Sequence, residues 1–276
     1  MAEAQAKSGK IRVSKADIYY EISGTGTPFV MIHAGVADSR QWNHEFKHFS
    51  QDFEVIRYDM RGYGKSEPAA EKFSHLNDIT ELFQELQIDV PVILMGCSMG
   101  GGLAMDYTLA NPGHVKALVM VGSGPSGLEL DVEEPEEFAD AVKAFEDGDL
   151  DRVAEIETQI WFDGMGRASN MTNQEMRQLA YEMNRTALGH EVMGEGERQS
   201  DTDSPAYNRL DEIDIPVLII VGSHDLPYMH KAAEYMKQGL KSARFELIED
   251  AAHLPNMDQP AIFQGLVDDF LDDLKL

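Results

Sequence analysis

The sequence predicts an α/β fold, in which a mostly parallel, doubly wound sheet carries an inserted helical cap. Runs rich in Val, Ile, Leu and Met recur along the chain and are nearly continuous, without alternating polar residues. Such runs are typical of strands buried on both faces, as in a parallel sheet covered by helices. Amphipathic stretches separate the runs, which favours right-handed crossovers between neighbouring parallel strands.

Each element follows from its local pattern. Residues 11–22 alternate weakly between apolar and polar types, and this predicts an antiparallel hairpin at a sheet edge. Strands are expected at residues 29–32, 53–56, 92–95, 117–121, 216–221 and 244–248, and helices at residues 42–49, 74–86, 98–110, 229–240 and 261–274. The alternation of strand and helix breaks between about residues 127 and 210.

This break predicts the cap. The stretch is poor in strand patterns and rich in helix formers, and it contains Trp161 and five of the 15 methionines. We therefore expect residues 1–127 and 211–276 to form the core and residues 128–210 to form a helical cap, or lid. Met165, Met176 and Met183 either pack the cap onto the core or line a pocket for an apolar acyl chain, because methionine adapts to irregular shapes.

The charge of the chain excludes some partners. Its 49 Asp and Glu residues against 23 Lys and Arg give a net charge of −26, which repels nucleic-acid phosphates and anionic lipids. Residues 128–210 carry 21 acids and seven bases, a net charge of −14. Ten of those acids lie between residues 131 and 151, where a solvated face is a better interpretation than a metal site.

The cysteine content and the hydropathy of the chain predict its cellular compartment. Cys97 is the only cysteine, so the chain forms no internal disulfide and no thiolate-rich zinc site. Residues 1–10 lack the apolar segment of a secretory signal, and no apolar run approaches the roughly 18 residues of a membrane span. We expect a soluble, cytoplasmic protein that binds neither membranes nor nucleic acid.

The strongest local signal is Gly96-Cys97-Ser98-Met99-Gly100, which directly follows one expected strand and precedes a helix. A G-x-S-x-G sequence between strand and helix indicates a nucleophile elbow, in which a strained turn presents the serine above the sheet. A chance glycine-rich turn is the alternative, and the strand–turn–helix context argues against it. A phosphate-binding loop would need a G-K-[ST] ending. We expect the Cys97 side chain to pack in the core.

Serine needs a base to become a nucleophile, and His253 is the candidate. It lies between the last expected strand and the last helix, at the sheet edge where doubly wound folds place functional groups. His33 ends a strand and is expected to form structural hydrogen bonds. Solvated surface positions are expected for the histidines among charged residues: His44, His48, His75, His114, His190 and His230.

The carboxylate that orients the base is expected at Asp225, in the Gly-Ser-His-Asp loop after the strand at residues 216–221. The corresponding loop after residues 117–121 contains no acid. Glu249 and Asp250 compete, but they share the His253 loop and reach the far side of the imidazole poorly. The resulting chain order is Ser98, Asp225 and His253.

A tetrahedral intermediate also needs two backbone N–H donors for its oxyanion. Met99, which follows the nucleophile, should supply one, and Gly35 after the strand at residues 29–32 should supply the other. Substrate contacts are expected from four residues in the cap or near the triad: Trp161, Leu226, Met229 and Leu254. Neither a metal nor a cofactor is expected.

These motifs resemble the α/β-hydrolase superfamily over nearly the whole chain. The match rests on the elbow GCSMGG, His33-Ala34-Gly35, the acid loop GSHD, the final AAHLP and the segment DMRGYGKS at residues 59–66. The family commonly has His-Gly where this chain has His33-Ala34. The resemblance implies that Asp59 and Arg61 are structural. It also separates this chain from similar dehalogenases and epoxide hydrolases, which need Asp at position 98.

The residue set is similar to that of carboxylesterases, enol-lactonases, C–C bond hydrolases and cofactor-free perhydrolases. The expected activity is hydrolysis of a small, neutral carboxylic ester through a Ser-His-Asp triad and an acyl-enzyme, with water as the second substrate. A negative cap favours neutral esters.

Two alternatives remain open. A C–C hydrolase or enol-lactonase of aromatic catabolism would need a positive pocket for substrate carboxylates. Six arginines could supply it: Arg152, Arg167, Arg177, Arg185, Arg198 and Arg209. A ligand-sensing signalling protein on a hydrolase fold is the other alternative, and it would hydrolyse activated esters very slowly.

Overall fold

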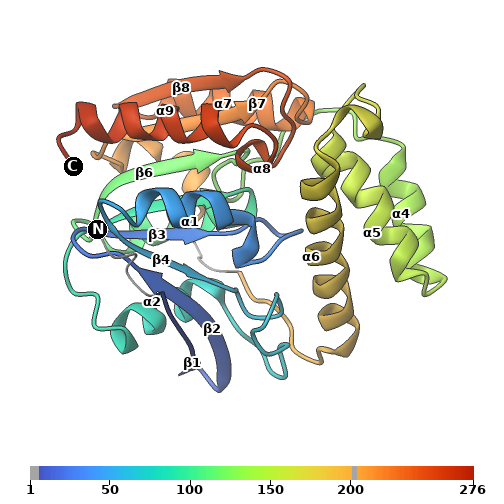
Figure 1. Cartoon of the computed structure of the whole chain (residues 1–276), viewed down its shortest axis with the longest axis horizontal. Coiled ribbons are helices and arrows are strands. Elements are labelled where there is room, and N and C mark those ends of the chain that lie inside the picture. The colour runs from blue at the N-terminus through green and yellow to red at the C-terminus, as the bar shows by residue number, and fades with distance from the viewer. Residues whose placement is uncertain (1–5, 201–203) are drawn as a thin grey trace.

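A computed structural model describes residues 6–200 and 204–276, in which eight strands form one sheet between two layers of helices (Figure 1). The strand order is β1-β2-β4-β3-β5-β6-β7-β8, and all neighbours are parallel except β1 with β2 and β2 with β4. The strands are β1 Lys7–Val13, β2 Ala16–Ser23, β3 Pro28–Ile32, β4 Glu54–Tyr58, β5 Val92–Cys97, β6 Val115–Val121, β7 Val217–Gly222 and β8 Ala243–Ile248. The mostly parallel sheet and the edge hairpin are confirmed.

Helices cover both faces of this sheet. One layer holds α2 (His75–Glu85), α3 (Met99–Ala110) and α7 (Pro227–Gly239), and the other holds α1 (Asn43–Phe49) and α9 (Pro260–Asp273). A short 3-10 helix, η1 (Ser39–Trp42), leads into α1, and α8 (Pro255–Asp258) precedes α9. The helices expected in the core are present within a few residues of their predicted bounds, whereas α8 was not expected.

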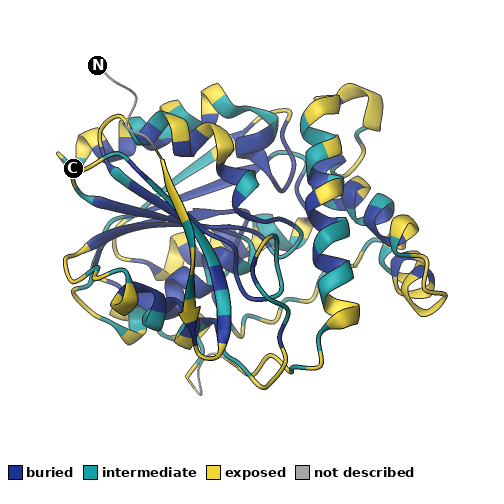
Figure 2. Cartoon of the chain, turned by 60° about the horizontal axis from the view of Figure 1, so that its bottom comes forward, coloured by how far each residue is buried: buried dark blue, intermediate teal, exposed yellow. Residues whose placement is uncertain are grey.

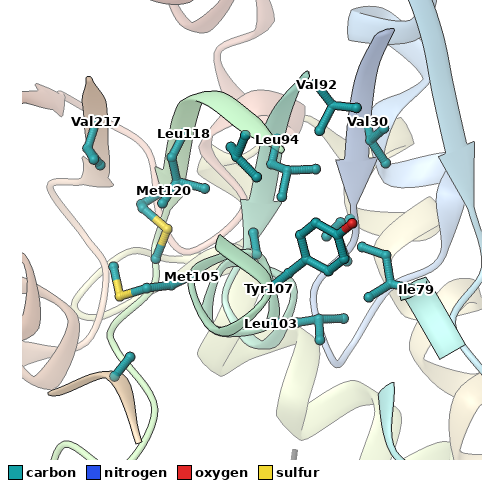
Figure 3. Close-up of a cluster of buried hydrophobic side chains, with 14 of the residues drawn as sticks. Val30, Ile79, Val92, Leu94, Leu103, Met105, Tyr107, Leu118, Met120 and Val217 are labelled. Atoms are coloured by element: carbon teal, nitrogen blue, oxygen red, sulfur yellow. The ribbon is translucent and has the colours of Figure 1, made fainter. Parts of the chain in front are cut away.

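Alternation along the central strands explains their continuous apolar runs. Val30, Leu94 and Leu118 are register partners on β3, β5 and β6, and they point toward α2 and α3 (Figure 3). Their neighbours Phe29 and Ile93 belong to the cluster on the opposite face, with α1 and α9. Because successive strand residues point to opposite faces, a strand covered on both sides must be apolar throughout. The central strands are accordingly buried (Figure 2).

The chain between β6 and β7 forms a helical segment at the end of the molecule toward which β3 and β6 point (Figure 1). It consists of α4 (Glu137–Glu146), α5 (Leu150–Thr158), the π-helix η2 (Gln159–Asp163), the 3-10 helix η3 (Ser169–Met171) and α6 (Gln174–Met193), and two further 3-10 turns, η4 (Ala206–Asn208) and η5 (Leu210–Glu212), lead back to β7. Its described residues contain no strand.

The surface of the helical segment carries the acidic cluster. All ten acids between residues 131 and 151 are exposed, which confirms a solvated face. Met176 and Met183 pack into the core cluster on the α1 and α9 face, whereas Met165 is 42% exposed. Packing onto the core, one of the two alternatives, therefore applies to Met176 and Met183 but not to Met165. No helix in the described part of the chain combines the length and apolar character needed to cross a bilayer.

Candidate active site

Ser98 lies in the strained turn that the sequence predicts. β5 ends at Cys97 and α3 begins at Met99, and Ser98 between them has φ 52° and ψ −117°. Its N–H donates to the Val121 carbonyl at 2.9 Å. A positive φ is costly for a residue with a side chain, and it persists only where the surroundings enforce it. The turn is therefore held in place by the end of β6.

Two glycines of the elbow are required by close approach. A Cβ at Gly96 would lie 2.3 Å from the Gly100 carbonyl oxygen, and a Cβ at Gly100 would lie 2.5 Å from the Ile32 and His33 oxygens. Any side chain there would push α3 away from β5 and β3. The two glycines of the G-x-S-x-G motif are therefore required by close backbone packing beneath the serine.

His253 and Asp225 form a buried pair. The imidazole Nδ1 is 3.0 Å from each Asp225 oxygen, and the two side chains are 2% and 0% exposed. Asp225 Oδ1 also accepts the Leu226 N–H at 2.8 Å. Because the carboxylate only accepts, Nδ1 carries the proton and Nε2 keeps its lone pair. This is the tautomer that a general base needs.

The elbow and the histidine loop lie next to each other. The thiol of Cys97, the residue before Ser98, donates to the His253 carbonyl oxygen at 3.6 Å. Among residues 6–200 and 204–276, no hydrogen bond joins the Ser98 hydroxyl to the imidazole. Such contacts are often long in unliganded enzymes and shorten when substrate binds.

Cys97 itself is fully buried, as the sequence predicts. Burial raises the pKa of its thiol to about 12, so the group stays protonated near neutral pH. Since the thiolate is the reactive form of cysteine, Cys97 does not act as the nucleophile.

The two expected oxyanion donors lie in adjoining segments of the chain. A Cβ built on Gly35 would lie 3.7 Å from the Met99 side chain, so the loop after β3 adjoins the start of α3. Within the described chain, neither Gly35 N–H nor Met99 N–H donates to a protein acceptor. Met99 is the first residue of α3, where N–H groups have no partner in the helix. Both donors are therefore available to a ligand.

His33 and Arg61 have structural contacts. His33 Nε2 accepts the Met60 N–H at 2.9 Å and Nδ1 donates to the Ala34 carbonyl at 2.7 Å, while burial lowers the pKa of the ring. Arg61 binds Asp78 through two hydrogen bonds of 2.8 and 2.6 Å. Asp59, in turn, accepts the backbone N–H groups of Ser39 and Lys65, each at 2.7 Å.

Two cavities lie near the candidate site, and the lining of neither includes Ser98, Asp225 or His253. The larger has a volume of about 370 Å³ and a mixed polar and apolar lining that includes Gly35, Tyr63, His75, Glu157, His190 and Arg198. The smaller has a volume of about 160 Å³ and a mainly apolar lining that includes Phe138, Trp161, Leu226 and Met229. The Trp161 ring centre is 4.5 Å from that of His253, so Trp161 both contacts the candidate base and lines the apolar cavity.

Three of the four expected substrate contacts therefore meet in one cavity. Leu254 does not join them: it is 1% exposed, packs in the core, and lines only a void of about 10 Å³. His75 differs from expectation, because it is 2% exposed at the start of α2 and lines the larger cavity. The surface position predicted for His75 is wrong. Its charged neighbours in the sequence could not indicate that a cavity lies beside the start of this helix.

The arginines of the helical segment differ in their contacts. Ion pairs with acids hold Arg167, Arg177, Arg185 and Arg209. Arg198 lines the larger cavity, with Nη1 2.8 Å from the Met99 sulfur. Glu157 faces the same cavity and accepts the Asn184 amide at 2.7 Å, and burial raises its pKa. No group of three or more His, Cys, Asp or Glu side chains in the described residues is arranged to hold a metal.

Comparison with known proteins identifies the family of this chain. Residues 27–260 match the model of the family described as alpha/beta hydrolase fold. The chain belongs to this family. Its relatives include a putative 2-succinyl-6-hydroxy-2,4-cyclohexadiene-1-carboxylate synthase from Bacillus subtilis, 26% identical over 95% of this chain and 98% of that protein. A pimeloyl-[acyl-carrier protein] methyl ester esterase from Nitrosospira multiformis is 25% identical over 91% and 97%.

Solved structures share the α/β-hydrolase fold. An esterase from Thermogutta terrifontis has a TM-score of 0.75 and 21% identity, covering 97% of this chain and 98% of its own. An enol-lactonase from Burkholderia xenovorans has a TM-score of 0.76 and 20% identity, covering 96% and 100%. These matches show the fold, and the curated relatives support a hydrolase.

Proposed function

We propose that this α/β hydrolase is a serine hydrolase that cleaves a small carboxylic ester through Ser98, His253 and Asp225. The observation that carries the proposal is the buried His253–Asp225 pair beside a serine held at positive φ in the elbow. A buried carboxylate on Nδ1 leaves Nε2 as a base, and a strained turn exposes a hydroxyl to it.

The chemistry follows in two steps. His253 Nε2 takes the Ser98 proton while Oγ attacks the acyl carbon, and the Gly35 and Met99 N–H groups stabilise the oxyanion. The imidazolium then protonates the leaving oxygen, the ester C–O bond breaks, and an acyl-enzyme remains. Water then loses a proton to His253 and attacks this acyl group. As the bond from the acyl carbon to Ser98 Oγ breaks, the imidazolium returns the proton to Oγ and the acid is released. The mechanism uses no metal or cofactor.

The apolar cavity supports a small, neutral substrate group. Phe138, Trp161, Leu226 and Met229 line about 160 Å³, which is room for a short alkyl or aryl group. We propose that Trp161, Leu226 and Met229 bind this group and that residues 128–210 act as the lid over it. Leu254 then supports the pocket wall from the core.

A second candidate is a C–C bond hydrolase or enol-lactonase. The specific observation in its favour is Arg198, which lines the larger cavity beside the Gly35 loop. A guanidinium there would suit a substrate carboxylate. Glu157 and Glu191 line the same cavity and oppose this, so the neutral ester is the preferred substrate.

The test compares wild type with Ser98→Ala on p-nitrophenyl acetate, p-nitrophenyl butyrate and an enol-lactone. We expect Ser98→Ala to fold normally and lose hydrolysis, and a fluorophosphonate to add one label to wild type but not to the variant. Ser242→Ala, which changes an exposed serine next to β8, is the matched control and should keep both properties. Retained hydrolysis by Ser98→Ala would refute the triad. A higher kcat/KM for the lactone than for either ester would favour the second candidate.

A further inference from the structure

A chain of buried polar side chains runs beneath the site and takes no part in the chemistry above. Gln41 on η1, Glu45 on α1 and Asn256 on α8 are 1%, 0% and 0% exposed. The Ala34 N–H donates to Gln41 Oε1 at 2.9 Å, and Gln41 Nε2 donates to Asn256 Oδ1 at 3.3 Å. Asn256 Nδ2 donates to Glu45 Oε2 at 3.0 Å and to the Gln41 carbonyl at 2.9 Å.

The side chains of Gln41, Asn256 and Glu45 form a hydrogen-bonded relay, and each of its hydrogen bonds has a fixed donor and acceptor. The Ala34 N–H can only donate, which requires the oxygen of Gln41 to face it and the Gln41 amide nitrogen to face Asn256. The backbone carbonyl of Gln41 can only accept, so it independently orients Asn256 with its amide nitrogen toward Glu45. Turning over either amide would put two donors or two acceptors face to face. The relay therefore has a single satisfied arrangement.

Its two ends adjoin the two loops that must cooperate in catalysis. Ala34 directly precedes Gly35, the proposed oxyanion donor, and Asn256 lies three residues after His253, the proposed base. Gln41 and Asn256 are 215 positions apart in the chain, so no local turn sets their separation. Apolar side chains would fill the same space at lower desolvation cost, whereas a fully satisfied polar network specifies one geometry.

We propose that Gln41 and Asn256, anchored by Glu45, are positioning residues that hold the Gly35 N–H in register with His253. This inference rests on the proposed hydrolysis. Oxyanion stabilisation depends on donors placed within a few tenths of an ångström of the developing charge. If the relay is cut, the oxyanion loop and the histidine loop move independently, and the transition state loses more than the bound substrate does.

The experiment uses Gln41→Met and Asn256→Leu, which keep side-chain size and remove the amides. We expect kcat for p-nitrophenyl butyrate to fall about 10- to 100-fold, as when an oxyanion donor is displaced, with KM changed less than threefold. Affinity for a trifluoromethyl ketone, which forms an oxyanion adduct with the serine, should fall by the same factor as kcat/KM.

The matched control is Gln264→Met. Gln264 Nε2 donates to Glu45 Oε1 at 3.3 Å from α9, so this variant removes a hydrogen bond to the same buried carboxyl without touching either loop. Its melting temperature should fall by about as much as those of Gln41→Met and Asn256→Leu, and its kcat should stay within twofold of the wild-type value. Parallel loss of kcat in the control would show that the effect is general destabilisation and would overturn the proposal.

Gln41→Glu gives a second readout if the apolar variants do not fold. Its carboxylate still accepts the Ala34 N–H but donates to Asn256 only when protonated. The ratio of its kcat to the wild-type kcat should therefore rise as pH falls from 8 to 6, and a flat ratio would overturn the proposal. If Ser98→Ala retains hydrolysis, the proposed function fails. If Ser98→Ala is inactive while Gln41→Met and Asn256→Leu fold and keep kcat within twofold, only the relay fails.

Discussion

Replacing Glu45 with Gln should stabilise the protein increasingly as pH rises. Glu45 is 0% exposed, and burial raises the pKa of its carboxyl from 4.5 to about 7, although hydrogen bonds from Asn256 and Gln264 oppose the shift. A raised pKa means that the folded state holds a proton that the unfolded chain has already released. Wild-type stability therefore declines as pH rises between about 4.5 and 7.

The size of the effect follows from this shift. Each unit of pKa difference corresponds to about 1.4 kcal/mol, so the ionised, buried Glu45 costs roughly 3 kcal/mol above pH 7. At pH 5 most of that cost is absent, because Glu45 is protonated in the folded state. The stability advantage of Glu45→Gln over wild type should widen by roughly 2 kcal/mol between pH 5 and pH 8.

Urea denaturation followed by circular dichroism at pH 5, 6, 7 and 8 measures this gap. Other groups titrate equally in both proteins, so their contributions cancel in the difference. Glu45→Met is the control, since it also removes the titration: its absolute stability will differ, but its gap to wild type should widen by the same amount. A gap that is constant within 0.5 kcal/mol, or that narrows toward pH 8, would refute the reasoning.

Three further predictions concern the helical segment and the charge. The Arg167 guanidinium pairs with Asp258 at 2.5 Å and both side chains are 6% exposed, so Arg167→Met should cost about 3–5 kcal/mol by leaving a buried charge unpaired. Thermal denaturation checks this, and Arg167→Met with Asp258→Asn should recover part of the loss; a melting temperature equal to wild type would contradict it. Trp161→Ala should enlarge the apolar cavity and raise the hexanoate-to-acetate ratio of kcat/KM for p-nitrophenyl esters about 10-fold, with Tyr228→Phe, at the same cavity, as control. An unchanged ratio would exclude Trp161 from the substrate pocket. Because the net charge is −26, added NaCl should raise the melting temperature toward molar salt with activity retained, and a fall in both would count against self-repulsion.

Much of the fold could be predicted from the sequence because the patterns that indicate strands and turns are local. A strand covered on both faces must be apolar throughout, so β3, β5, β6 and β7 are visible as continuous runs. The elbow could be predicted because its G-x-S-x-G spacing is local, and Gly96 is required by the backbone of Gly100 only four residues away. The contact of Gly100 with the end of β3, in contrast, is visible only in the folded structure. Candidates for the serine, acid and base could therefore be named from strand ends alone.

The contacts between distant segments needed the tertiary structure. Nothing near Gln41 in the sequence indicates that its amide meets Asn256, and nothing near His75 indicates a cavity beside it. The pairing of Arg167 with Asp258 and the place of Arg198 beside Met99 likewise depend on how the helical segment sits over the sheet. A residue's own neighbours set its backbone conformation and its hydrophobic period, whereas the pKa of Glu45 and the shape of the cavities are set by side chains that only folding brings into contact.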